Sequence, residues 1–217
     1  TMPISSQTSP PAKFAICAAS SMSAPPAIDT ARVAITVSPA PETSATLRAL
    51  CDPAVQTEYL AADARDYLFV YIDFNQMLVM SDQAFYELIL RASIEAIRSQ
   101  NINGDVLRKV EDAYTSLVAP ASPFEVPLGF AQGMAAIGDQ LKEKVVFLFD
   151  EVDGPVAGID GRVFLNLRGL RDRHPVGLTY VTATNRRLDQ IRRDSDVLEF
   201  AEMFEHSTLY ISMLHEA

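Results

Sequence analysis

Hydrophobic residues along the chain gather into short unbroken runs, which alternate with longer segments where they recur every three or four residues. The clearest run lies in KVVFLFDEVD, residues 144–153, where five apolar side chains are followed directly by Asp150 and Glu151. A run this short, β-branched and aromatic, is typical of a strand buried on both faces. Such strands belong to parallel sheets flanked by helices, where ligands bind at the carboxyl ends of the strands.

The remaining runs predict four further strands, and together with the first they place strands at about 32–37, 67–73, 145–150, 177–183 and 208–213. Between them, helical spacing of apolar residues predicts helices over 46–55, 82–100, 105–118, 128–143 and 160–174, with short helical pieces in 187–205. Pro53 should end the first helix, Pro127 should belong to an irregular link, and a loop should follow Asp153. This alternation predicts an α/β fold of three layers, with a mostly parallel sheet and helices on both faces.

The first part of the chain has a different composition. Residues 1–31 are rich in Ser, Pro, Ala and Thr and contain few large apolar residues. Such a segment buries too little surface to offset the entropy lost on ordering, so we expect disorder there and a folded core over 32–217.

Charge and cysteine content narrow the function classes. The net charge of −10 argues against binding to nucleic acid or to an anionic membrane, because both require a basic surface. No apolar run is long enough to cross a membrane, and no secretory signal is evident at the start. Two cysteines, Cys17 and Cys51, form no metal-binding spacing, which favours a reducing, cytoplasmic setting.

Two predicted strands end in polar side chains. Asp150 and Glu151 end one, and Thr184 and Asn185, in TATN, end the next along the chain. Paired acids at this place are built like a Walker B element, where one acid helps to hold Mg²⁺ and the other polarises the attacking water. The alternative is simpler: solvated acids at a strand end, and a Thr-Asn pair that caps the following helix.

From Leu47 onward the chain resembles the nucleotide-binding domain of bacterial AAA-like P-loop ATPases of the STAND type. The matching stretches are TLRALCDPAV, YLFVYIDFNQML, KVVFLFDEVD, FLNLRGLRDRHPVGLTYVTATNRRLDQI and FAEMFEHSTLYISML. The resemblance implies that ATP binds with Mg²⁺, that Asp150 holds the metal, that Glu151 activates water, and that Thr184 or Asn185 senses the γ-phosphate. It also implies a nucleotide-dependent switch that acts on other protein domains, with the lid subdomain of the family absent from this chain.

One element of that family is not recognisable. The glycine- and lysine-containing phosphate loop should precede Leu47, but the sequence there is VSPAPETSAT, with no glycine and no lysine. Only hydroxyl groups, those of Ser38, Thr43, Ser44 and Thr46, are available to contact a nucleotide or its metal. We therefore expect weak binding of MgATP at best.

Several interpretations of this departure stay open. The chain is a working ATPase switch, or a degenerate relative that keeps the fold as an interaction or scaffold module. An upstream frameshift or a wrongly assigned start would equally explain the missing loop. A different doubly wound enzyme that uses Asp150 and Glu151 to bind a metal is a weaker third interpretation.

The other polar residues favour structural roles. We expect the arginines of the second half to form a solvated surface, and His174 and His206 to cap elements or lie on the surface. Asp73, at the end of a strand, is typical of a turn. The arginines concerned are Arg162, Arg168, Arg171, Arg173, Arg186, Arg187, Arg192 and Arg193.

Overall fold

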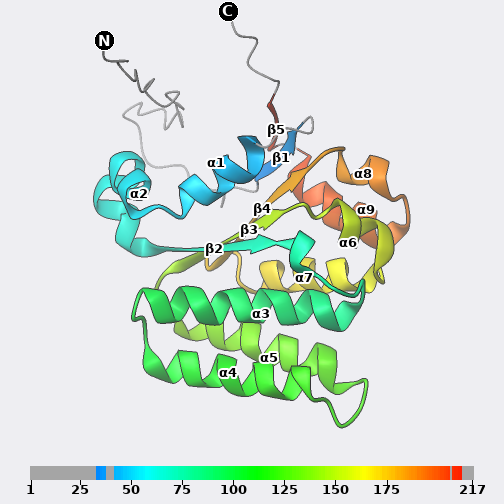
Figure 1. Ribbon diagram of the computed structural model, residues 1–217, viewed down its shortest axis with the longest axis horizontal. Coiled ribbons are helices and arrows are strands. Elements are labelled where there is room, and N and C mark those ends of the chain that lie inside the picture. The colour runs from blue at the N-terminus through cyan, green and yellow to red at the C-terminus, as the bar shows by residue number, and fades with distance from the viewer. Residues whose placement is uncertain (1–32, 38–41, 206, 212–217) are drawn as a thin grey trace, which may run out of the picture.

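The computed structural model describes residues 33–37, 42–205 and 207–211 (Figure 1). The prediction of disorder over residues 1–31 therefore lies outside the described residues. The described part is a three-layer α/β fold, in which a sheet separates α1 and α2 on one side from α3, α4, α5 and α7 on the other (Figure 1). The predicted fold class is confirmed.

The sheet consists of five parallel strands in the order β2-β3-β4-β1-β5. The observed bounds agree with the predicted ones to within one residue wherever the structure describes them. The strands are β1 (Val33–Val37), β2 (Tyr67–Asp73), β3 (Lys144–Asp150), β4 (Leu178–Thr184) and β5 (Thr208–Ile211).

The core has two parts, because successive side chains of a strand point to opposite faces. Phe147 and Phe149 of β3 belong to a large cluster with the helices on one face, whereas Val146 and Leu148 belong to a smaller cluster with Leu47 of α1. All four strand residues are at least nine-tenths buried. The expectation that this run is covered on both faces is confirmed.

Two helices, α1 and α2, occupy the segment in which the sequence predicted one. α1 covers Glu42–Leu50, so it begins four residues before the predicted start at 46, and α2 covers Pro53–Leu60. Pro53 begins α2 instead of ending α1, since a proline at the first helical position gives up no hydrogen bond. The Asp52 carboxylate caps α2 by accepting the Ala54 backbone N–H at 2.8 Å. A 3₁₀ turn, η1 (Ala61–Asp66), leads into β2.

Three helices lie between β2 and β3. After the turn η2 (Phe74–Gln76), α3 (Asp82–Ser99) and α4 (Gly104–Val118) match the prediction. The next helix, α5, covers Glu125–Gln140 instead of 128–143. Pro127 lies inside its first turn, where the missing N–H has no helical partner to lose, so assigning it to an irregular link was wrong.

The second half of the fold surrounds β4. The residues after β3 form a short helix, α6 (Asp153–Gly158), where a loop was predicted, and α7 (Arg162–Arg173) follows. After β4 come α8 (Leu188–Ile191), α9 (Ser195–Ala201) and the turn η3 (Glu202–Phe204), as expected for 187–205. Among the described residues, no helix combines the length and the apolar character that a membrane crossing requires.

Candidate functional site

The connections of the sheet create a crevice between β1 and β4. These two strands are neighbours, but the helices that follow them cover opposite faces. Leu47 of α1 packs in the smaller cluster, whereas Leu188 of α8 and Phe200 of α9 pack in the larger one. Where the following helices diverge in this way, the carboxyl ends of parallel strands form the usual ligand site of doubly wound folds.

The structure brings most of the predicted site residues together at this crevice. Asp150, Glu151, Thr184 and Asn185 line one cavity with Thr43 of α1, and Asp153 and Ala183 complete its wall. The cavity measures about 10 Å³, which is close to the smallest volume that holds one water molecule. Of the other predicted contacts, Ser44 and Thr46 lie half-buried on α1 without lining the cavity, and Ser38 lies outside the described residues.

The Thr43 side chain carries a buried polar atom that needs a partner. The residue is 8% exposed, and its Oγ1 accepts and donates no hydrogen bond within the described part of the chain. Leaving a buried hydroxyl unsatisfied costs about 1–3 kcal/mol. A water molecule, a cation or a polar ligand in the cavity would satisfy it.

Asp150 is held by side chains that the sequence did not point to. Its Oδ2 accepts a 2.6 Å hydrogen bond from the Tyr71 hydroxyl of β2, and that hydroxyl accepts one from Arg48 Nε of α1 at 3.0 Å. Arg48 also lies 3.6 Å from Asp73, which pairs with Asp150 in the register of β2 and β3. Burial and the bond to Asp150 raise the pKa of Tyr71 far above its usual value, so the hydroxyl remains a donor.

Glu151 has an unusual backbone and a shifted pKa. Its φ of 56° lies in the left-handed region, which costs a non-glycine residue about 1 kcal/mol or more. Burial, followed by the charges of Asp150, Asp153 and Asp73, raises the pKa of Glu151, while a hydrogen bond from the Asn185 side chain opposes that rise. A carboxylate with a raised pKa is a better proton acceptor, as a general base requires.

Asn185 is fixed by the helix that follows β3. Its backbone N–H donates to both carboxylate oxygens of Asp153, at 3.0 and 3.2 Å. Neither Thr184 nor Asn185 caps the following helix, because the N-cap residue of α8 is Arg187. The simpler interpretation of TATN as a helix cap was therefore wrong.

The oxygen atoms at this cavity suit a hard cation such as Mg²⁺ when water or phosphate oxygens complete its coordination. Within the described ranges, no three His, Cys, Asp or Glu side chains are grouped so that they could hold a metal ion themselves. Mg²⁺ is usually bound by one or two carboxylates together with water and phosphate oxygens. Asp150 and the Thr43 hydroxyl, which the described residues leave without a hydrogen bond, supply oxygen ligands of that kind at one cavity.

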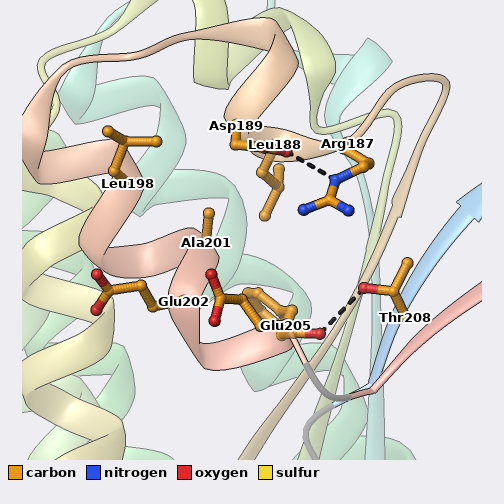
Figure 2. Close-up of a pocket in the computed structure, with 9 residues that line it drawn as sticks. Arg187, Leu188, Asp189, Leu198, Ala201, Glu202, Glu205 and Thr208 are labelled. Carbon is orange, nitrogen blue, oxygen red and sulfur yellow. Dashed lines mark hydrogen bonds and ion pairs between the residues drawn. The ribbon is translucent and has the colours of Figure 1, made fainter.

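The arginine-rich half of the chain is mostly engaged in ion pairs. Arg168 lies 3.2 Å from Glu202 and 3.6 Å from Glu199, and Arg162, Arg187 and Arg192 each pair with an aspartate two residues away. Arg171 is buried, so the expectation of a solvated surface was wrong for that residue. Figure 2 shows Arg187 paired with Asp189 at the edge of a second cavity, of about 220 Å³, beside α8, α9 and β5.

The remaining predictions concern His174, His206 and Asp73. His174 is the C-cap residue of α7 and is 7% exposed, so it is a buried cap and not a surface residue. Asp73 accepts the Asn75 backbone N–H at 3.0 Å, which confirms its place in a turn. His206 lies outside the described residues.

Comparison with known proteins supports the fold alone. No protein-family model matches the chain, and no curated protein sequence does. Two structures of the ORC2 protein from Aeropyrum pernix are similar to it. The one with ADPNP and ADP has a TM-score of 0.55 at 13% identity, and the ADP form has 0.53 at 14%. A structure of Cdc6p from Pyrobaculum aerophilum has a TM-score of 0.48 at 14% identity.

These similarities concern the fold alone: the described part of the chain shares the architecture of the two ORC2 structures. The aligned part covers 84% of this chain and 42% of the ADPNP–ADP structure, so the chain spans less than half of that protein.

Proposed function

We propose that the chain is the core of an AAA-type ATPase of the STAND kind, a switch module whose acidic sheet edge receives MgATP. Thr43 carries the proposal: its buried hydroxyl has no hydrogen-bond partner among the described residues, and it lines the same cavity as Asp150, Glu151, Thr184 and Asn185. A polar atom left unsatisfied at the ligand edge of a doubly wound sheet is expected where a ligand completes the site.

Each residue has a role that its geometry supports. Thr43 and Oδ1 of Asp150, the carboxylate oxygen that Tyr71 does not contact, would hold Mg²⁺, which supplies charge neutralisation for the phosphates when bound. Glu151, whose pKa is raised, would accept the proton of the attacking water. Asn185, held by Asp153 and hydrogen-bonded to Glu151, would orient that carboxylate toward the γ-phosphate.

The start of α1 adds a weak anion site. The backbone N–H groups of its first turn have no helical partners, and the positive end of the helix dipole lies there. Without glycine and lysine in VSPAPETSAT, however, several charge-assisted bonds to phosphate are missing. Each is worth about 1.5–3 kcal/mol, so two missing bonds reduce affinity by roughly two orders of magnitude or more.

Calorimetric titration with MgATP tests the proposal. We expect the unmodified chain to bind more weakly than micromolar. A chain in which residues 38–42 are replaced by a glycine- and lysine-containing phosphate loop that leads into Thr43 should bind at least ~100-fold more tightly. In that repaired chain, Glu151→Gln should keep MgATP affinity and abolish phosphate release, because it removes the proton acceptor and keeps the shape.

Two further substitutions distinguish nucleotide binding at the acidic edge of the sheet from nucleotide binding elsewhere on the chain. Asp150→Asn in the repaired chain should weaken MgATP more than magnesium-free ATP, whereas Asp189→Asn, at the second cavity, should change neither. A repaired chain that folds but binds no nucleotide would contradict the proposal. Micromolar affinity in the unmodified chain would instead show that other groups hold the phosphates.

The composition of the interval before Leu47 favours a second candidate, a degenerate ATPase that serves as an interaction or scaffold module. Pro39 and Pro41 remove two backbone amides that a phosphate loop would use. This candidate differs in one measurable respect: neither MgATP nor magnesium alone should change the thermal stability of the unmodified chain.

A further inference from the structure

Exposed apolar side chains are concentrated at one end of the molecule. Among the described residues, eight large hydrophobic side chains are exposed, and Tyr59 and Val176 lie away from this end. The other six belong to the segment before α3 and to the α4–α5 connection with the first turn of α5, at the end of the fold where α3 and α5 begin (Figure 1). They are Leu78, Val79, Met80, Val118, Phe124 and Leu128, hereafter the apolar rim.

A groove of about 760 Å³ lies beside this rim, and three residues of its lining, Ser81, Pro123 and Pro127, are direct chain neighbours of the rim residues Met80, Phe124 and Leu128. Its walls are the first turns of α3 and α5, the proline-rich connection of residues 120–123, and the start of α7. Tyr86, which is 2% exposed, and Asn166 provide polar groups in the wall. This volume is in the range of sites that hold a small molecule or a few residues of a peptide.

Cross-element hydrogen bonds hold the groove in shape. Gln83 Nε2 donates to the carbonyls of Leu117 and Val118 at 3.0 and 3.3 Å, which ties α3 to the end of α4. Asn166 Nδ2 donates to the Tyr86 hydroxyl at 2.7 Å and ties α7 to α3. A groove that is already formed requires little ordering when a partner binds.

One side chain of the apolar rim, Met80, is held against a neighbouring helix, although the rim as a whole is exposed to solvent. A Cβ atom placed on Gly158 of α6 would lie 2.8 Å from Met80 Cγ, so the Met80 side chain rests on the backbone of that helix. Leu78 nevertheless remains 98% exposed and Phe124 84% exposed. Exposed apolar residues that gather in one region mark interaction surfaces more often than singly scattered ones do.

The charged residues around the groove indicate which kind of partner it can bind. Asp82 and Asp160 line it, Glu125 begins the adjoining helix, and the one cation of the lining, Arg162, already lies 3.9 Å from Asp160. The whole chain carries −10. A second copy would bring the same acids to a two-fold interface, whereas a basic partner would meet complementary charge.

We propose that this groove and its apolar rim bind a short segment of another protein that carries at least two large apolar side chains and a lysine or arginine. The apolar side chains fill the groove against the rim, and the basic group meets Asp82 and Asp160. The surface is separate from the acidic edge of the sheet, so the proposal does not depend on nucleotide binding.

Selection from a phage-displayed library of random 12-residue peptides on the full chain tests the proposal, followed by fluorescence anisotropy with the selected peptides. We expect peptides with two or more large apolar residues and net positive charge. Leu78→Asp combined with Phe124→Asp should weaken them at least tenfold, and 0.5 M salt should weaken them severalfold. The control, Tyr59→Asp with Val176→Asp, changes two exposed apolar residues away from the rim and should have no effect.

Three outcomes would overturn the assignment. The first is a selection that yields no peptide with a preference for the unmodified chain over the folded double variant. The second is a set of selected peptides that is acidic or lacks apolar residues. The third is a dimer in sedimentation velocity that the rim variant abolishes, which would assign this face to a second copy of the chain.

Discussion

The hydroxyl of Tyr71 on β2 donates a 2.6 Å hydrogen bond to Oδ2 of Asp150 at the end of β3. Asp150 is 2% exposed, so this bond satisfies a carboxylate oxygen that has little access to water. Arg48 of α1 donates to the same hydroxyl and thereby links α1 to the acidic edge. The principal acid of the proposed site is therefore oriented by neighbours on two other elements.

Tyr71→Phe should lower the free energy of unfolding by about 1–3 kcal/mol, because it leaves a buried oxygen of Asp150 without its donor. Urea unfolding of both proteins measures the difference. In an Asp150→Ala background the same change should cost far less, since the acceptor is already gone. Tyr59→Phe, on the exposed face of α2, is the control and should be neutral. A neutral Tyr71→Phe would contradict the importance of this bond.

Glu151→Gly should be more stable than Glu151→Ala by about 1 kcal/mol, because glycine adopts a φ of 56° without a steric penalty. Both variants lack the carboxylate, so their difference isolates the backbone. Urea unfolding at neutral pH measures it. If the alanine variant is equally stable or more stable, the left-handed conformation carries no strain.

Gly138→Ala should destabilise the fold by about 1–3 kcal/mol, since the new methyl group would lie 2.7 to 2.8 Å from the ring of His174. Thermal unfolding, combined with urea titration, measures this cost. Gly169→Ala is the matched control: it is also a helical glycine, nothing lies within 4 Å of its added Cβ, and it should stabilise by about 0.5–1 kcal/mol. Equal effects of the two substitutions would exclude a steric role for His174.

Cys51 should react slowly with iodoacetamide, because burial raises the pKa of its thiol to about 11. In a Cys17→Ser background at pH 8, the folded protein should be alkylated about 100-fold more slowly than the urea-unfolded protein, in proportion to the thiolate fraction. Equal alkylation rates in both states would show that the thiol is not protected.

The raised pKa also predicts a pH dependence of stability. Since the Cys51 thiol stays protonated to higher pH in the folded state than in the unfolded state, it should lower the free energy of unfolding as pH rises from about 9 to 11.

Much of the architecture follows from local patterns. Runs such as 145–150 combine high strand propensity with polar residues at their ends, so the type and the order of these elements can be predicted without the rest of the fold. Helix starts were predicted less well. Pro53 and Pro127 are both compatible with a first helical turn, and only packing decided that helices begin there.

The proposed site was predictable in part for the same reason. Parallel strands share one carboxyl edge, so Asp150 and Thr184 had to lie on the same edge once both strands joined one sheet, and the pairing of β3 with β4 brought them close together. Thr43 came to the same edge because α1 begins at Glu42, where Leu47 can be buried against Val146 and Leu148.

What the sequence determined by itself is therefore the alternation of strands and helices, the acids and hydroxyls at two strand ends, and the absence of glycine and lysine from residues 37–46. Only the tertiary structure decided which strands are neighbours, that Tyr71 reaches Asp150, and that a groove forms between α3, α5 and α7 beside the apolar rim. The physical reason is that propensity and periodicity act over a few residues. Register and groove shape instead depend on contacts between residues far apart in the chain, such as Tyr71 and Asp150.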